Sequence, residues 1–300
     1  MELIEIKKNK RMVFRAEGFG DLADYATKSA RPDESSSKKS SGGDRFYTAT
    51  TFGKSVDLMV DGWDTHTDTI TAIRDAVRQR VGSLDTAVFS FENNLVGQYL
   101  DMDAYMQGDP MCMLSALEDT TKRPTKFVRI LVDTAFSAGV NAKDIATRGG
   151  AILALCDLLN LMGYSTEVWV ASGISSSYGE FGDAGGQMVV LMPVQLAGQP
   201  WDTRSASYPL ACGDFLRRMT FGIMEGMSSV ARNTFGVGTG YGFPMASTKG
   251  GLADEHCGGA DVICQTNVGD IDKIVRDPVA WVLSQCQNLG VLSAEEVGAL

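Results

Sequence analysis

The stretch FVRILVDTAFSAGVNAKDIATRGGAILALCDLLNLMGYSTEVWVA, residues 127–171, indicates the fold class of this chain. Phe127–Val132 is a nearly continuous apolar run of strand length, which is typical of a strand covered on both faces of a parallel sheet. Ala142–Met162 has apolar residues at helical spacing, and Gly163 follows it as a C-terminal cap residue would. Ser165–Ala171, after the glycine, predicts the next strand. Strand, helix and strand in this order predict a βαβ unit with a right-handed crossover.

The rest of the C-terminal half extends this pattern. Residues 187–194 predict a third strand and 260–265 a further short strand, while 214–225 and 278–290 predict helices. Asp214 is a candidate N-cap, and Pro278 suits the first position of a helix. Gly149 and Gly150 fall inside the helix of the βαβ unit, where they indicate a close approach of helix to sheet. We therefore expect an α/β fold with a three-layer, mostly parallel sheet flanked by helices, Rossmann-like in arrangement.

The N-terminal part predicts smaller elements around a polar segment. Residues 1–30 form a strand-helix element, because Arg11–Arg15 suits a strand and Phe19–Asp24 a helix start. Residues 31–44 contain no large apolar side chain, so they are expected to be a flexible linker. Residues 45–126 then form an α+β extension of the α/β domain, which occupies 127–300.

Composition limits the classes of function. The 300 residues carry 27 Lys and Arg against 37 Asp and Glu, a net charge of −10, which disfavours binding to nucleic acid. No apolar run is long enough to span a bilayer, and the N-terminus lacks the apolar region of a signal peptide. We expect a soluble protein in the cytoplasm, or the host cytoplasm if a phage encodes it, with protein partners and no membrane contact. The six cysteines form no C-x-x-C pair, and with two histidines they make a structural zinc site improbable.

Asp133 and Ser137 follow the first strand of the βαβ unit, at the edge where open α/β sheets bind ligands. A carboxylate and a hydroxyl there are candidate Mg²⁺ ligands. The alternative is that both residues cap the loop and the following helix. Asp101, Asp103 and Asp109 are a second candidate metal cluster, with turn formation as the more common role.

A glycine-alternating segment, Phe235–Pro244, predicts an exposed loop that could close over a partner. Phe235 and Tyr241 in this segment, with Arg217 and Arg218 on the preceding helix, are therefore candidate partner-binding residues. No Walker A sequence, nucleophile elbow or His-Glu-x-x-His motif occurs, so we assign no catalytic residue.

Residues 127–290 resemble a von Willebrand factor A-type domain, in which the first strand ends in Asp-x-Ser-x-Ser. The corresponding residues here are Asp133, Ala135 and Ser137, so this metal-ion-dependent adhesion motif is degenerate. Locally, Gly108–Met113, Arg148–Leu153 and Phe215–Phe221 are similar to an uncharacterised family of bacterial and bacteriophage proteins. The first resemblance implies loop-borne recognition with Mg²⁺ as the one candidate cofactor, and the second implies a phage origin.

Together these observations predict a non-enzymatic protein-binding or scaffold module of phage origin that uses its strand-end loops for recognition. One alternative is an accessory factor in phage transcription or replication that binds nucleic acid or a polymerase. This alternative requires Arg74, Arg78, Arg80, Arg217 and Arg218 to converge on one face. A metal-dependent hydrolase is the other alternative, and it requires carboxylates beyond Asp133.

Overall fold

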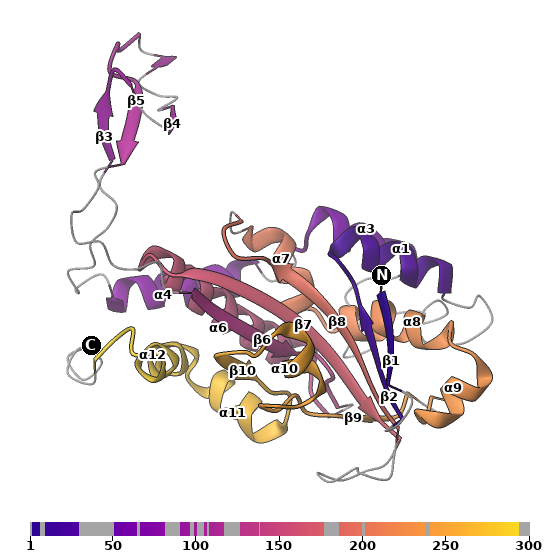
Figure 1. The fold of residues 1–300 in the computed structure, drawn as a ribbon. Coiled ribbons are helices and arrows are strands. Elements are labelled where there is room, and N and C mark those ends of the chain that lie inside the picture. The colour runs from indigo at the N-terminus through magenta and orange to yellow at the C-terminus, as the bar shows by residue number, and fades with distance from the viewer. Residues whose placement is uncertain are drawn as a thin grey trace.

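The computed structural model describes residues 2–6, 10–29, 51–64, 67–81, 91–96, 99–100, 105–106, 108–116, 127–137, 139–176, 186–199, 202–237 and 241–293. The expected linker at 31–44 lies outside these residues, as do Asp101 and Asp103. The main sheet has the strand order β1-β2-β8-β7-β6-β10 (Figure 1). Its strands are β1 (Glu2–Ile6), β2 (Arg11–Arg15), β6 (Phe127–Asp133), β7 (Ser165–Ser175), β8 (Gln187–Gln195) and β10 (Val262–Cys264), and β9 (Phe243–Pro244) pairs with the end of β7.

The sheet is mixed and mostly parallel. Strand β6 pairs in parallel with β7 on one side and β10 on the other, and β2 pairs in parallel with β8. The β7–β8 and β1–β2 pairs are antiparallel. The expected α/β class and the βαβ unit are therefore confirmed. Because β1 and β2 belong to this sheet, the N-terminal strand-helix element and the 127–293 region share one sheet.

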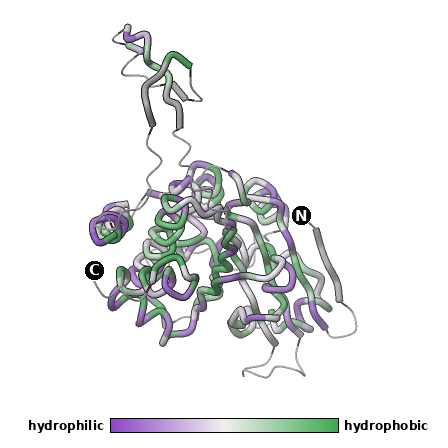
Figure 2. The backbone as a smooth tube through the Cα atoms, turned by 60° about the vertical axis from the view of Figure 1, so that its left-hand side comes forward, coloured by the Kyte–Doolittle hydropathy of each residue, from purple (hydrophilic) through white to green (hydrophobic). Residues whose placement is uncertain are grey.

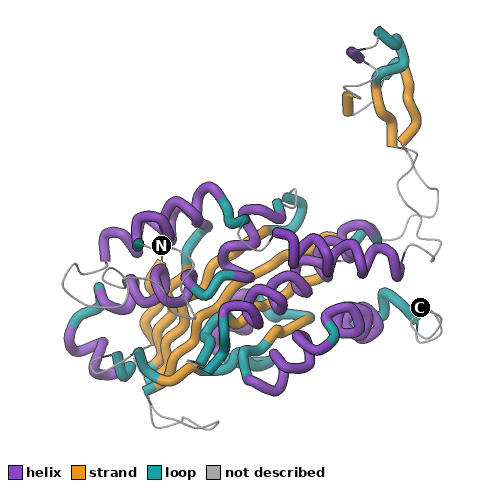
Figure 3. The backbone as a smooth tube through the Cα atoms, turned by 180° about the vertical axis from the view of Figure 1, so that it is seen from behind, coloured by secondary structure: helices purple, strands orange, loops and turns teal. Residues whose placement is uncertain are grey.

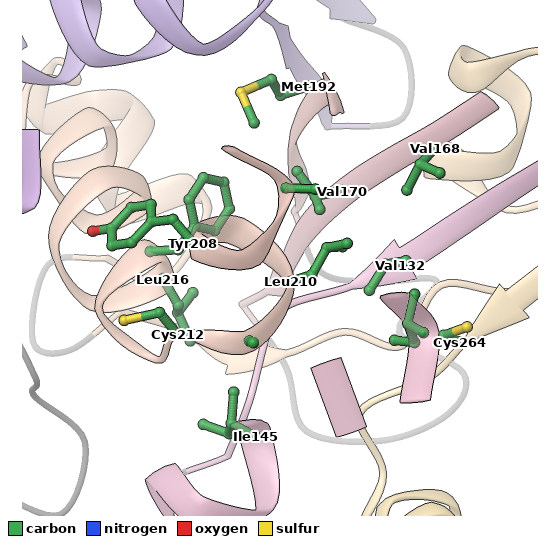
Figure 4. Packing of buried hydrophobic residues seen from close by; sticks show 14 of the residues in the cluster. Val132, Ile145, Val168, Val170, Met192, Tyr208, Leu210, Cys212, Leu216 and Cys264 are labelled. Atoms are coloured by element: carbon green, nitrogen blue, oxygen red, sulfur yellow. The ribbon is translucent and has the colours of Figure 1, made fainter. Parts of the chain in front are cut away.

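The helices lie unevenly on the two faces. One face of the sheet carries a large apolar cluster, and several helices contribute buried side chains to it. These helices are α1 (Phe19–Ser29), α3 (Phe52–Asp61), α4 (Thr67–Val81), α6 (Ala142–Leu161), α7 (Thr203–Ala211), α11 (Val268–Arg276) and α12 (Pro278–Asn288). Figure 3 shows these helices in front of the strands, and Figure 4 shows side chains from β6, β7, β8 and β10 meeting α6 and α7. The opposite face carries a smaller cluster under α10 (Leu252–Cys257). Strand β6 is buried between both clusters, which is why its sequence is apolar at consecutive positions.

Local signals set the ends of several helices. The Asn141 side chain accepts a hydrogen bond from the Asp144 N–H and so caps α6, and Gly163 follows its end with a φ of 79°. The Asp277 side chain caps α12 directly before Pro278. The predicted helix at 214–225 is instead a π-helix, η2 (Phe215–Thr220), followed by α8 (Phe221–Glu225), and α9 (Ser229–Thr234) comes next. Asp214 lies at the predicted N-cap position, directly before the π-helix, but it has helical backbone angles and its side chain makes no capping hydrogen bond to that helix.

The glycines of α6 serve helix packing rather than the expected contact with the sheet. A Cβ at Gly149 would lie 2.4 Å from the Cβ of Ala211 in α7, and one at Gly150 would lie 3.0 Å from Cδ1 of Ile73 in α4. Two neighbouring helices therefore approach α6 closely at this pair. The prediction of a close approach was right, but the partners are helices.

A second, small sheet has the order β3-β5-β4 and comprises β3 (Phe91–Asn94), β4 (Tyr99–Leu100) and β5 (Met113–Ala116). Both of its pairings are antiparallel. Figures 1 and 2 draw it apart from the main sheet. Among the described helices, none is long and apolar enough to cross a membrane.

Candidate functional site

The loop after β6 lies where the chain changes direction across the sheet. From β6 the chain passes through α6 to β7 on one side, and it returns to β6 on the other side as β10. In open α/β sheets, the crevice outside the carboxyl ends of such strands is the usual place for a ligand. Asp133 is the last residue of β6, so the position predicted from the sequence is the position observed.

The Asp133 carboxylate joins three segments that are far apart in the sequence. Its Oδ1 accepts a hydrogen bond from the Ala135 N–H at 3.0 Å, and its Oδ2 accepts one from the Ser247 N–H at 3.1 Å. The Thr266 hydroxyl lies 3.3 Å from Oδ2 and 3.3 Å from the Ala135 carbonyl, so it shares its hydrogen between them. The carboxylate therefore fixes the β6 loop, the segment before α10 and the segment after β10 to one another.

The carboxylate of Asp133 has no exposed surface. Burial raises its pKa from 3.8 to about 6, although the hydrogen bonds from Ala135 and Ser247 and the charge of Arg148 oppose the rise. A buried acid with this pKa changes its charge near neutral pH, which affects stability (Discussion).

Arg148 is the second buried charge at this edge, and it comes from α6. Its Nη2 donates to the carbonyl of Asp133 at 2.9 Å and to the carbonyl of Cys264 at 2.7 Å, so it bridges the ends of β6 and β10. Its guanidinium carbon lies 5.3 Å from the centre of the Phe136 ring. Its Nε and Nη1 are buried and find no hydrogen-bond partner among the residues that the structure describes, and burial lowers the pKa of this guanidinium. Sequence reasoning missed this role, although an arginine among the apolar residues of a buried helix was a signal.

A chain of hydroxyl groups lies on the helix-covered side of the same edge. The Thr134 and Ser172 hydroxyls are 2.6 Å apart, and the Thr220 hydroxyl donates to Ser172 at 3.2 Å. All three side chains are buried. They link β6, β7 and the π-helix, a contact that no local motif indicated.

The metal hypothesis requires free oxygens, and the geometry offers few. Both Asp133 oxygens already face N–H or O–H donors, which repel a cation, and Ser137 is not among the groups bonded to that carboxylate. Within the described part of the chain, no group of three or more His, Cys, Asp and Glu could hold a metal ion. In the other candidate cluster, the Asp109 carboxylate accepts a hydrogen bond from the Met111 N–H, as a turn former does. The residues present therefore fit the capping interpretation of Asp133 better than a metal centre.

The structure separates the four candidate partner-binding residues into two groups. Arg217 and Tyr241 are half-buried and meet at Phe221: the Arg217 guanidinium lies 5.3 Å from its ring centre, and the Tyr241 ring stacks on it at 3.7 Å. The Tyr241 hydroxyl also donates to the Glu225 carboxylate at 2.5 Å.

Arg218 and Phe235, by contrast, are buried, with 0% and 3% exposure. They are core residues in this structure, because the π-helix turns Arg218 inward and the loop after α9 folds Phe235 against Gly186. A partner could reach only Arg217 and Tyr241 without a rearrangement.

The exposed apolar residues of the carboxyl edge were not predicted from sequence. Phe243 in β9 is 43% exposed, and Val268 at the start of α11 is 56% exposed. Each belongs to a segment held by Asp133, through Ser247 and Thr266 respectively.

No curated protein and no solved structure gives a significant match to this chain. One family profile covers most of it, from the end of the first strand through α11. On the basis of this match to residues 5–275, the chain belongs to the family of the domain of unknown function DUF7192.

Proposed function

We propose that this protein is a non-enzymatic protein-binding module whose recognition surface is the carboxyl edge of β6, β7 and β10. The observation that carries the proposal is the Asp133 network. The buried carboxylate accepts hydrogen bonds from Ser247 and Thr266, which belong to the segments that carry Phe243 and Val268. These hydrogen bonds restrict the backbone that positions the two exposed apolar side chains. A preorganised surface loses little entropy when it binds, which favours recognition.

The polar groups of this edge support binding more than catalysis. The Asp133 carboxylate and the Thr134, Ser172 and Thr220 hydroxyls are buried and hydrogen-bonded to other groups of the chain. A nucleophile or a general base must instead reach a substrate atom. We also propose a relationship to von Willebrand factor A-type domains, which is supported by the position of Asp133 at the end of an inner parallel strand. A phage origin is a further part of the proposal.

The nucleic-acid alternative requires several arginines to share one face. Arg74 forms an ion pair with Asp157, which also lies 3.5 Å from Nη2 of Arg78, and Arg218 is buried. These charges are partly neutralised or withdrawn from the surface. No specific observation therefore favours this alternative.

A paired affinity capture tests the proposal. The bait is the full chain, compared with Phe243→Ser/Val268→Ser, in extracts of the organism that encodes it. A matched control, Leu161→Ser/Leu196→Ser, removes two residues with 49% and 39% exposure from the opposite edge, at the end of α6 and just after β8. We expect the same partner with wild type and control, and a loss of about tenfold or more with the carboxyl-edge variant. Equal recovery with all three baits would contradict the proposal.

A further inference from the structure

Arg148 is a buried cation whose hydrogen-bonding capacity is only partly used. The side chain has no exposed surface, and its Nη2 donates to the carbonyls of Asp133 and Cys264. Its Nε and Nη1 also carry N–H groups. In the part of the chain that the structure describes, these groups find no acceptor. A buried donor without an acceptor destabilises the fold, and more so when it is charged, so we expect an acceptor from outside the chain to complete this site.

The fold places these donors at the carboxyl edge of the sheet. Arg148 lies in the second turn of α6, and helical side chains point back toward the N-terminus of their helix. The guanidinium therefore lies beside the ends of β6 and β10, where open α/β sheets bind ligands. Phe136, in the loop after β6, is buried, and its ring centre lies 5.3 Å from the guanidinium carbon. Its ring therefore covers one side of this cation.

The neighbouring charges restrict the ligand to an anion with a single charge. Burial lowers the pKa of Arg148, and the negative charges of Asp133 and Asp270 oppose this shift. The oxygens of both carboxylates accept hydrogen bonds from other groups, so neither of them serves the unused donors of Arg148. A carboxylate ligand brings one negative charge and forms strong charge-assisted hydrogen bonds. The additional charge of a phosphate would be repelled by the two aspartates, so a carboxylate fits this site better.

We propose that Arg148 binds a carboxylate of the protein partner, from an aspartate, a glutamate or a chain end, which enters the carboxyl edge beside Phe136. This inference rests on the protein-binding function proposed above and adds the chemistry of one contact to it. When the Phe136 ring is displaced, the carboxylate accepts hydrogen bonds from the N–H groups that lack an acceptor. The exposed side chains of Phe243 and Val268 at the same edge supply apolar contacts around it.

The test uses acetate as the probe and the full chain labelled with ¹⁵N-arginine, because the Nε–H signal of an arginine responds to a new acceptor nearby. Arg129 is the internal control, since its Nε already donates to the Glu167 carboxylate at 2.8 Å. Acetamide, which resembles acetate in shape but has no charge, is the ligand control. Phe136→Leu removes the ring beside the guanidinium, so the Arg148 signal is the one that it shifts most. Arg148→Lys, which lacks this signal, provides a second assignment.

We expect the Arg148 signal to move saturably with acetate, with a dissociation constant on the order of 10 mM, because so small a ligand binds weakly. The Arg129 signal should stay in place, and acetamide should have no effect. Phe136→Leu should bind acetate several-fold more tightly, since no aromatic ring has to be displaced. Three results would overturn the inference: an Arg148 signal that does not move at a tenfold excess over that constant, a common linear drift of both arginine signals, or tighter binding of phosphate than of acetate.

The partner's contribution is tested on the captured complex. Acetate should release the partner from the wild-type bait several-fold more effectively than acetamide at the same concentration. Equal release by both would show that the partner brings no carboxylate to Arg148, and the inference would be wrong although the protein-binding function stands. Equal capture by all three baits would instead refute that function, while the acetate titration, which needs no partner, still decides whether Arg148 binds a carboxylate.

Discussion

Replacing Asp133 with Asn removes one buried charge and one hydrogen-bond acceptor from the carboxyl end of β6. The carboxylate accepts from Ala135 on one oxygen and from Ser247 and Thr266 on the other. An asparagine has a single oxygen, so its NH₂ group must face a donor in either orientation. Leaving one such buried donor unsatisfied destabilises the fold by about 1–3 kcal/mol.

The lost charge acts in the opposite direction, and its effect depends on pH. The folded pKa of Asp133 is about 6 and the ordinary value is 3.8. The folded state therefore holds this proton more tightly than the unfolded state. The resulting stabilisation is fully present below pH 3.8 and is lost as pH rises through 6. The loss totals about 3 kcal/mol, of which roughly 2 kcal/mol falls between pH 4.5 and pH 7.5.

Asp133→Asn should therefore be clearly less stable than wild type at pH 4.5, and the difference should shrink or change sign at pH 7.5. Urea unfolding of both proteins at the two pH values measures this, because all other groups titrate alike and cancel in the comparison. The difference in unfolding free energy between the proteins should change by about 2 kcal/mol. A difference that stays constant between the two pH values would refute the raised pKa.

Three further predictions concern the core and the metal hypothesis. Ile130→Asp should abolish cooperative unfolding, because it buries an unpaired charge in an inner strand. The control Ile130→Val should lower the free energy of unfolding by only about 0.5–1.5 kcal/mol. If circular dichroism shows that the Asp variant is folded, the assigned position of this strand is contradicted. Gly149→Ala should destabilise the folded protein by about 1–3 kcal/mol, because the new Cβ would lie 2.5 Å from the backbone of Ala211. The control Gly53→Ala, on α3, places its Cβ in open space and should be neutral or stabilising. Equal shifts of the melting temperature in the two variants would argue against the close packing of α6. Calorimetric titration with Mg²⁺ and Mn²⁺ should show no heat with wild type, and heat that disappears in Asp133→Asn would restore the metal hypothesis.

Local signals were sufficient for the βαβ unit. Each of its signals can be recognised within a short segment of sequence, because hydrophobic periodicity and helix capping depend on neighbouring residues. These signals are the apolar run at Phe127–Val132, the helical spacing up to Leu161 and the glycine at 163. The position of Asp133 at the end of an inner strand followed directly. A strand buried on both faces needs consecutive apolar residues, and the sequence shows them.

Other features depended on contacts between distant segments. Ser247 and Thr266 are 114 and 133 residues from Asp133, so their hydrogen bonds to it could not be read from local pattern. The burial of Arg218 and Phe235 likewise depended on a π-helix and a loop that pack against other elements. The sequence by itself thus determined the secondary structure around β6 and the candidate residue at its end. Only the tertiary structure decided which groups surround that residue and which face solvent, because burial and hydrogen-bond partners are properties of segments brought together by the fold.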